Sequence, residues 1–368
     1  MKNIPFVDLK KQYLSIKEEI DKAIQDVILN SAFIKGGYVK KFEENFGKYI
    51  GLDYCIGVGS GTDALFIALK SLGIKEGDEV ITVANSFIAT SEAITMTGAK
   101  VVFVDCDEET YNIDIHKFEK AITNKTKAVL PVHLYGQPAA MNKIVQIAEN
   151  SDLLVIEDAA QAHGAKYNNR NVGALSNCVC FSFFPGKNLG AYGDAGAILT
   201  NNEKLSNRMR MFANHGRIEK YQHEIEGTNS RLDGLQAAIL DVKLKYLDKW
   251  IERRRSIAKM YDEGLKRSAI VPKVLADVRH VYHLYVIRVK NRDEVISFLS
   301  DKGVSTGLHY PTPLPFLKAY EYLGYRPEDF PVAYSLKDEL LSLPIHGDMT
   351  DEQVEYVITN VTRIAEKP

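Results

Sequence analysis

The chain has 368 residues, of which 45% are hydrophobic and 26% are charged, so it is long enough to bury a large core. Its 46 Lys and Arg residues nearly balance 48 Asp and Glu residues, and the formal net charge is −2. This balance excludes an overall basic field that would draw the protein to nucleic acid or anionic lipid. Any anion that it binds must therefore be held locally.

Neither a targeting segment nor a membrane span is predicted. The N-terminal segment reaches Asp8 before any apolar stretch of signal length, and no later run approaches the ~20 apolar residues that cross a bilayer. We therefore expect a cytoplasmic protein. Cys178 and Cys180 lie two apart in an apolar stretch, and the chain has no Cys-x-x-Cys pair and no His-Glu-x-x-His helix. We expect neither disulfides nor a metal site.

From about residue 53 to 200, short apolar runs alternate with segments of helical length, which predicts a mainly parallel sheet flanked by helices. The predicted strands are Tyr54–Val58, Glu79–Val83, Val101–Val104, Ala128–Val132, Leu153–Ile156 and Val179–Phe183. The predicted helices between them are Thr62–Leu72, Ser86–Thr97, Asp114–Ile122 and Met141–Asn150. Such a sheet gathers its ligands at the carboxyl ends of its strands, so we look for chemistry there.

The later part of the chain has a different pattern. A charged helical stretch, Leu235–Lys266, precedes short strands such as His283–Val289 and a loop that contains Pro311, Pro313, Pro315 and Pro331. We place a domain boundary in the charged helix. This gives a large domain over residues 1–250 and a smaller C-terminal α+β domain over residues 251–368.

A glycine-rich segment, Gly57–Thr62, joins the first strand to the first helix of the sheet. At Ser60, Gly61 and Thr62 the free N–H groups and the positive end of a helix dipole would favour a phosphate. The spacing is not the G-x-G-x-x-G dinucleotide fingerprint, and the lysine of a P-loop is absent. The alternative is a turn in which Ser60 or Thr62 only caps the helix.

An acid and a lysine follow two later strands. The apolar strand before Asp158 runs into two carboxylates, and a protonated pyridine nitrogen or a structural arginine would offset such a charge. Lys187 lies in an aromatic and glycine-lined segment where an ammonium is poorly solvated. Desolvation lowers the pKa of a lysine and provides the unprotonated amine that Schiff-base chemistry needs. The alternative is an ordinary solvent-facing lysine.

Several motifs in order resemble the DegT/DnrJ/StrS family of nucleotide-sugar aminotransferases that depend on pyridoxal 5'-phosphate (PLP). They are Pro5–Leu9, Gly59–Leu65, Ile156–Gly164, Phe181–Asn188, Gly193–Gly196, Asn214–Gly216 and Asn229–Ala238. The resemblance runs the length of the chain. It implies the PLP-dependent transferase fold type I, in which a large α/β domain with a mainly parallel seven-stranded sheet is flanked by helices and joined to a smaller C-terminal domain.

The resemblance also implies a role for each matching residue. Lys187 would hold PLP as a Schiff base and shuttle protons, Asp158 would keep the ring nitrogen protonated, and Gln161 would reach the ring hydroxyl. The residues that would hold the phosphate or the ring face are Ser60, Gly61, Thr62, Ser182 and Phe87. Asn229 would reach the phosphate of a second chain, so we expect a homodimer with shared active sites.

The reaction that the resemblance implies has two halves. Glutamate would convert PLP to the pyridoxamine phosphate form, and a nucleotide-linked keto sugar would accept the amine. The segment around Lys187 is most similar to enzymes that aminate C-3 of a dTDP-linked 3-keto-6-deoxyhexose, with amination at C-4 as the alternative. The predicted substrate-binding residues are Phe183, Arg231, His309 and Tyr310, for which core packing, an ion pair or a structural histidine are the alternatives.

Two further hypotheses stay open. One is a PLP-bound regulator without turnover, because a fold does not determine a function. The other is an ordinary amino-acid aminotransferase, which would need a site for a second carboxylate. A lysine at position 187 argues against the sugar dehydratases of the family, which carry histidine there. We interpret His163 and Asp194 as structural.

Overall fold

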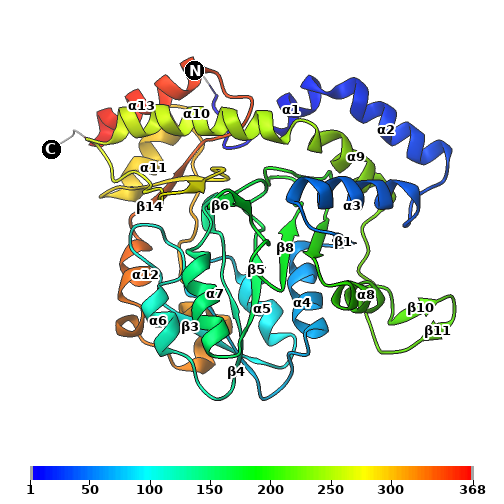
Figure 1. Cartoon of the computed structure of the whole chain (residues 1–368). Helices are drawn as coiled ribbons and strands as arrows, with labels where there is room; N and C mark the ends of the chain where they lie inside the picture. The colour runs from blue at the N-terminus through cyan, green and yellow to red at the C-terminus, as the bar shows by residue number, and fades with distance from the viewer. Residues whose placement is uncertain (1–2, 366–368) are drawn as a thin grey trace.

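The computed structural model describes residues 3–365 and is built around a seven-stranded sheet (Figure 1). The strand order is β1-β9-β8-β5-β4-β2-β3. The strands are β1 (Tyr54–Val58), β2 (Glu79–Val83), β3 (Lys100–Val104), β4 (Thr126–Leu130), β5 (Leu154–Asp158), β8 (Cys178–Ser182) and β9 (Gly196–Thr200). Only β9 runs antiparallel to its neighbours, which confirms the predicted mainly parallel sheet.

Most predicted strands lie within one or two residues of their positions. β1 and β2 match their predicted bounds, whereas β4 begins and ends two residues before the predicted run and β5 extends to Asp158. β9 was not predicted. It pairs with β8 in the antiparallel direction after a loop without a helix, so the alternation of strands and helices gave no signal for it.

Helices cover both faces of the sheet. One face carries α4 (Gly61–Ser71), α5 (Ile88–Thr95), α6 (Ile115–Lys120), α7 (Met141–Asn150) and α8 (Glu203–Phe212), and the other carries α3 (Gly37–Ile50) and α9 (Gly234–Leu244). α1 (Leu9–Ser15) and α2 (Lys17–Leu29) precede them, and the apolar side of α2 packs on α9. α4 begins where it does because Ser60 caps it. Its Oγ accepts a hydrogen bond from Asp63 N at 3.1 Å, a contact worth about 1 kcal/mol.

The predicted charged helix is two helices, because the chain turns at Lys245 and Tyr246 between α9 and α10 (Leu247–Leu265). α10 lies beside α13 (Asp351–Ala365) at the top of Figure 1 and packs with α11 (Arg292–Asp301) and the pair β13 (Tyr285–Arg288) and β14 (Leu340–Leu343). The core of this region contains Ile257 and Tyr261. By contrast, Leu314 and Leu336 pack into the sheet's own core. The division into two domains at residue 250 stays a prediction, because side chains from the C-terminal region pack into the core of the large sheet.

The proline-containing loop forms short helices, η2 (Leu314–Phe316), η3 (Lys318–Leu323), η4 (Pro327–Asp329) and α12 (Pro331–Leu336). The remaining elements are η1 (Leu134–Gly136), β6 (Lys166–Tyr167), β7 (Arg170–Asn171), β10 (Arg217–Glu219), β11 (Gln222–His223) and β12 (Val278–Arg279). The β10–β11 hairpin projects from the body beyond α8 (Figure 1). All four cysteines are free and buried. Within residues 3–365, no helix combines the length and apolarity that crossing a membrane requires.

Candidate active site

A cavity of about 560 Å³ lies at the carboxyl ends of the parallel strands. The predicted site residues that line it are Ser60, Gly61, Thr62, Phe87, Asp158, Gln161, Ser182, Lys187, His309 and Tyr310. Parallel strands end at the same edge of a sheet, so residues that follow different strands meet there. The cavity is closed from the other side by residues of the C-terminal region and by the N-terminal Phe6 and Val7.

Lys187 lies in a loop that folds back on itself after β8. The loop is tied where Ala191 N donates to Phe183 O at 2.7 Å and where Lys187 N donates to Phe184 O at 2.8 Å. Burial lowers the pKa of Lys187 to about 8, and the carboxylate of Asp158 opposes part of that shift. The amine is therefore unprotonated far more often than that of an exposed lysine.

Asp158 is the last residue of β5 and is 5% exposed. Its Oδ2 accepts a hydrogen bond from Thr90 Oγ1 at 2.8 Å, and its Oδ1 accepts one from Ala160 N at 3.1 Å. No arginine lines the cavity among the described residues, so Asp158 has no guanidinium partner there. The carboxylate is held in place and is free to meet a cation of a ligand.

The start of α4 forms a cradle next to β8. A Cβ atom added to Gly61 would lie 2.5 Å from Ser182 Cβ, so only glycine permits this approach. Ser60 caps the helix, as the alternative hypothesis of a capping turn predicted. The N–H groups of Gly61 and Thr62 have no acceptor within the helix. The cap formed by Ser60 therefore leaves these two N–H groups available to an anion.

Gln161 connects two elements that are distant in the sequence. Its Oε1 accepts from Tyr135 N at 2.6 Å, and its Nε2 donates to Tyr310 Oη at 3.0 Å. Next to Tyr310, His309 pairs through Nδ1 with Ser342 Oγ at 2.8 Å. Burial, followed by the charge of Lys187, lowers the pKa of His309 to about 4, so its imidazole is neutral near pH 7.

Several lining residues were not predicted as site residues. Among them are Phe6, Thr90, Phe184, Asp194 and His283. Asp194 was interpreted as structural, yet it is exposed at the cavity. Phe184 follows Ser182 by two residues, so extending the period of two beyond the predicted strand, which ended at Phe183, would have placed both side chains on one face. Nothing in the sequence placed Phe6 or His283 beside Lys187.

The structure does not place Phe183 in the cavity. Its side chain is 0% exposed and packs edge-on against Phe42 and Phe46 of α3. Because successive side chains point to opposite faces of a strand, Ser182 faces the cavity and Phe183 faces the core. The substrate-binding role predicted for Phe183 is corrected to core packing.

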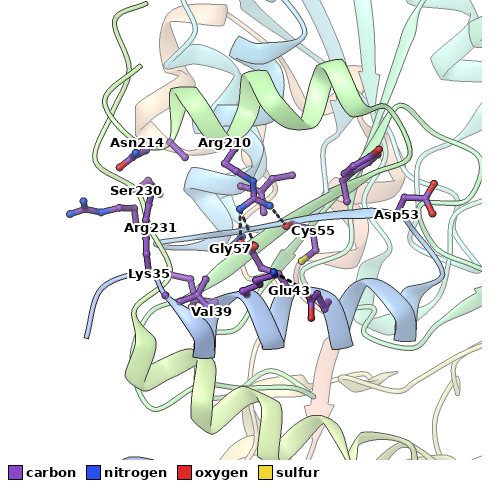
Figure 2. A pocket seen from close by; sticks show the side chains of 17 residues that line it. Lys35, Val39, Glu43, Asp53, Cys55, Gly57, Arg210, Asn214, Ser230 and Arg231 are labelled. Carbon is purple, nitrogen blue, oxygen red and sulfur yellow. Dashed lines mark hydrogen bonds and ion pairs between the residues drawn. The ribbon is translucent and has the colours of Figure 1, made fainter. Parts of the chain in front are cut away.

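Arg231 lies outside the Lys187 cavity as well. It lines a second cavity of about 430 Å³ beside β1, together with Lys35, Arg210 and Asn214 (Figure 2). Arg210 is paired there with Glu43 at 2.9 Å. Asn229, which pairs with Asn214 through a backbone bridge, is exposed and does not line the Lys187 cavity. Within one chain, therefore, neither Asn229 nor Arg231 reaches Lys187.

The fold and the cavity define an α/β protein of the PLP-dependent aminotransferase class. The chain matches the model of the DegT/DnrJ/EryC1/StrS aminotransferase family over residues 14–362. The protein belongs to this family. It is a PLP-dependent sugar aminotransferase.

Individual relatives are similar over nearly their whole length. The chain is 46% identical to the dTDP-3-amino-3,6-dideoxy-alpha-D-galactopyranose transaminase of Aneurinibacillus thermoaerophilus, covering 98% of this chain and 99% of the relative. It is also 46% identical to the pleiotropic regulatory protein of Geobacillus stearothermophilus, with 98% of each covered. The structure of DesV from S. venezuelae in complex with a ketimine intermediate superimposes with a TM-score of 0.98 at 42% identity, covering 100% of both chains.

The residues present fit PLP. The Gly61 cradle is open for a phosphate, Asp158 offers a carboxylate without a cationic side-chain partner beyond Lys187, and Lys187 offers an amine of lowered pKa. Phe87 exposes 55% of its surface at the same cavity, as an aromatic that packs on a ring would.

Proposed function

We propose that this protein transfers an amino group from glutamate to C-3 of a dTDP-linked 3-keto-6-deoxyhexose, in the formation of an amino deoxysugar. The observation that carries the proposal is the meeting of Lys187, Asp158 and the start of α4 around one cavity. The substrate is supported by the Aneurinibacillus relative, whose name specifies a dTDP-3-amino-3,6-dideoxy sugar.

Lys187 and Asp158 divide the chemistry. When bound, PLP would supply an aldehyde group that reacts with amines and a ring that accepts electrons. Lys187 Nζ would attach the cofactor and, once released, would accept a proton from the carbon that bears the amine and deliver it to the C4′ carbon of the cofactor. The carboxylate of Asp158, oriented by Thr90 Oγ1, would keep a proton on the ring nitrogen.

The other lining residues bind and orient. Gly61, Thr62 and Ser182 would bind the phosphate, Phe87 would pack on the ring, and the Gln161 amide would hold the ring hydroxyl. On the substrate side, Tyr310 and the neutral imidazole of His309 offer hydrogen bonds to the hexose. Because the aromatic side chains Phe6 and Phe184 also line the cavity, it presents both an apolar wall and a few polar groups, as sugar sites require.

Two residues act from a second chain in this proposal. Asn229 would contribute to the partner's phosphate site and Arg231 to the charge of the nucleotide diphosphate, so the active form is a homodimer. Mixing Lys187→Ala with Asn229→Ala chains tests the sharing. One intact site per mixed dimer should restore about a quarter of wild-type activity after random exchange. No recovery from verified mixed dimers would contradict a shared site.

The substrate is tested with a panel of 3-keto and 4-keto nucleotide sugars carrying dTDP or UDP, with products identified by mass spectrometry. We expect release of 2-oxoglutarate from glutamate beyond one equivalent per active site only when a keto sugar is present, and the largest kcat/KM for the dTDP-linked 3-keto-6-deoxyhexose. Preference for 4-keto sugars would overturn the position of amination. Because one relative is named as a regulator, absence of 2-oxoglutarate with every sugar would favour binding without turnover.

A further inference from the structure

We propose that Lys243 is a positioning residue for Lys187, acting through the loop that joins β8 to β9. Lys243 lies on α9, is 1% exposed and does not line the Lys187 cavity. Its Nζ donates a hydrogen bond to Gly190 O, three residues after Lys187. The inference rests on the proposed function, since it concerns how Lys187 is presented to the cofactor.

The backbone transmits the position of Gly190 to Lys187. A Cβ atom added to Gly190 would lie 2.2 Å from Pro185 O, so the chain after Lys187 rests directly on the chain before it. The hydrogen bond from Ala191 N to Phe183 O closes the same loop. Displacing the Gly190 carbonyl therefore displaces a closed loop that carries Lys187.

A second contact from α9 secures the far end of this segment. Gln236 Oε1 accepts a hydrogen bond from Tyr192 N at 2.8 Å, and Lys243 Nζ lies 4.7 Å from the centroid of the Tyr192 ring. Gln236 and Lys243 are seven residues apart, which places them on one face of the helix. Asp194, two residues after Tyr192, lines the cavity. α9 thus holds the segment between two lining residues.

α9 is held in place because two further faces of the helix pack against other elements. Ala237 and Leu240 pack into the core on the α3 side of the sheet, while Ile239 and Val242 pack against α2. A helix fixed by packing on two sides moves little relative to the sheet. The contacts of Gln236 and Lys243 therefore anchor the loop to the rigid body of the domain.

Stability alone does not account for a lysine at position 243. Burial lowers its pKa to about 8, and an apolar side chain of similar length would fill the site without burying an ammonium. Among residues 3–365, Lys243 is the only donor to Gly190 O. The role that remains for this side chain is to hold that carbonyl in place.

The test measures how fast the cofactor attaches, besides turnover of the holoenzyme. PLP is removed and added back, and the absorbance band expected near ~420 nm is followed over time. For Lys243→Met we expect attachment and kcat to fall by ~10- to 100-fold, the range for a displacement of about 1 Å at a reacting group, with KM of both substrates within about threefold of wild type.

Tyr261→Phe is the matched control. It removes a buried hydrogen bond to Pro344 O, 2.8 Å long, and Tyr261 does not line the cavity. If Lys243→Met lowers Tm as Tyr261→Phe does but attaches PLP and turns over like that control, the positioning role is overturned. If Lys243→Met does not fold, the rate of PLP attachment is measured for Gln236→Met instead. Slower attachment supports the proposal, and an unchanged rate overturns it.

Failure of this inference is distinguishable from failure of the proposed function. If Lys187→Ala still acquires an adduct that borohydride fixes at the active site, the assignment of Lys187 fails and the positioning role fails with it. If Lys187→Ala loses the adduct while Lys243→Met behaves like wild type, only the role of Lys243 is rejected.

Discussion

The Lys187 cavity and the cavity beside β1 each contain a lysine whose pKa is lowered, but their surroundings differ. For Lys187 the cause is burial, and the carboxylate of Asp158 opposes it. For Lys35 burial is joined by the charges of Arg217, Arg231 and Arg210, with Glu43 opposing. A lowered pKa therefore does not by itself identify a reactive amine. The proposal that Lys187 is the reactive amine is supported by its meeting with Asp158 and the start of α4 at one cavity.

The largest effect is expected at the lysine of the first cavity. Lys187→Ala should lower 2-oxoglutarate release by at least ~10³-fold, because it removes both the point of attachment and the general base. Lys35→Ala should keep the absorbance band of the bound cofactor. Borohydride reduction followed by peptide mass spectrometry locates the attachment. An adduct on Lys35 in place of Lys187 would show that the cofactor attaches in the second cavity and would contradict the proposal.

The acid of the first cavity should have the next largest effect. Asp158→Asn keeps the shape but removes a charge, and we expect kcat to fall by ~10- to 100-fold, the loss of a charge-assisted hydrogen bond. Since the carboxylate raises the pKa of Lys187, its removal should lower that pKa below about 8. Labelling of Lys187 in PLP-free protein across pH measures the shift. Asp194→Asn, a matched change at the same cavity, should leave the pKa unaltered.

A more selective effect is expected in the second cavity. Arg231→Ala should raise KM for the nucleotide sugar by ~10-fold, the contribution of one charged hydrogen bond, and leave KM for glutamate unchanged. Steady-state kinetics with each substrate varied in turn provides the measurement. Arg208→Ala, an exposed arginine of α8, is the control. Equal changes in both KM values would argue that Arg231 serves the structure and not the nucleotide.

The smallest effect concerns stability at Lys35. Its φ is +58°, so Lys35→Gly should relieve backbone strain and raise the free energy of unfolding by about 1 kcal/mol. Ser31, with φ +49°, provides a matched glycine variant without a charge. Urea unfolding should show a larger gain for Lys35→Gly at low salt and equal gains at 1 M salt, where the ~3 Å Debye length screens the arginines. An equal gain at low salt would mean that repulsion contributes nothing.

The alternation of apolar runs with helical segments determined most of the sheet, because each strand is buried and carries its own signal. The strand β9 was missed, and β4 begins two residues earlier than its apolar run. Asp158 was predicted from sequence because it ends a strong strand, and Lys187 because it lies in an aromatic and glycine-lined loop after the next strand of the sheet. Parallel strands bring such positions to one edge.

Only the tertiary structure decided which side chains face the cavity and which distant segments pack together. Ser182, at the end of β8, faces the cavity, and the next residue, Phe183, faces the core beside α3. Successive side chains point to opposite faces, so a shift of one residue would exchange them. Phe6 and His309, some three hundred residues apart, stack at 5.8 Å because the N-terminal segment packs beside the C-terminal region. Through local patterns, the sequence by itself determined which groups we propose to do the chemistry. Packing between distant segments decided which of them meet, since no local pattern encodes those contacts.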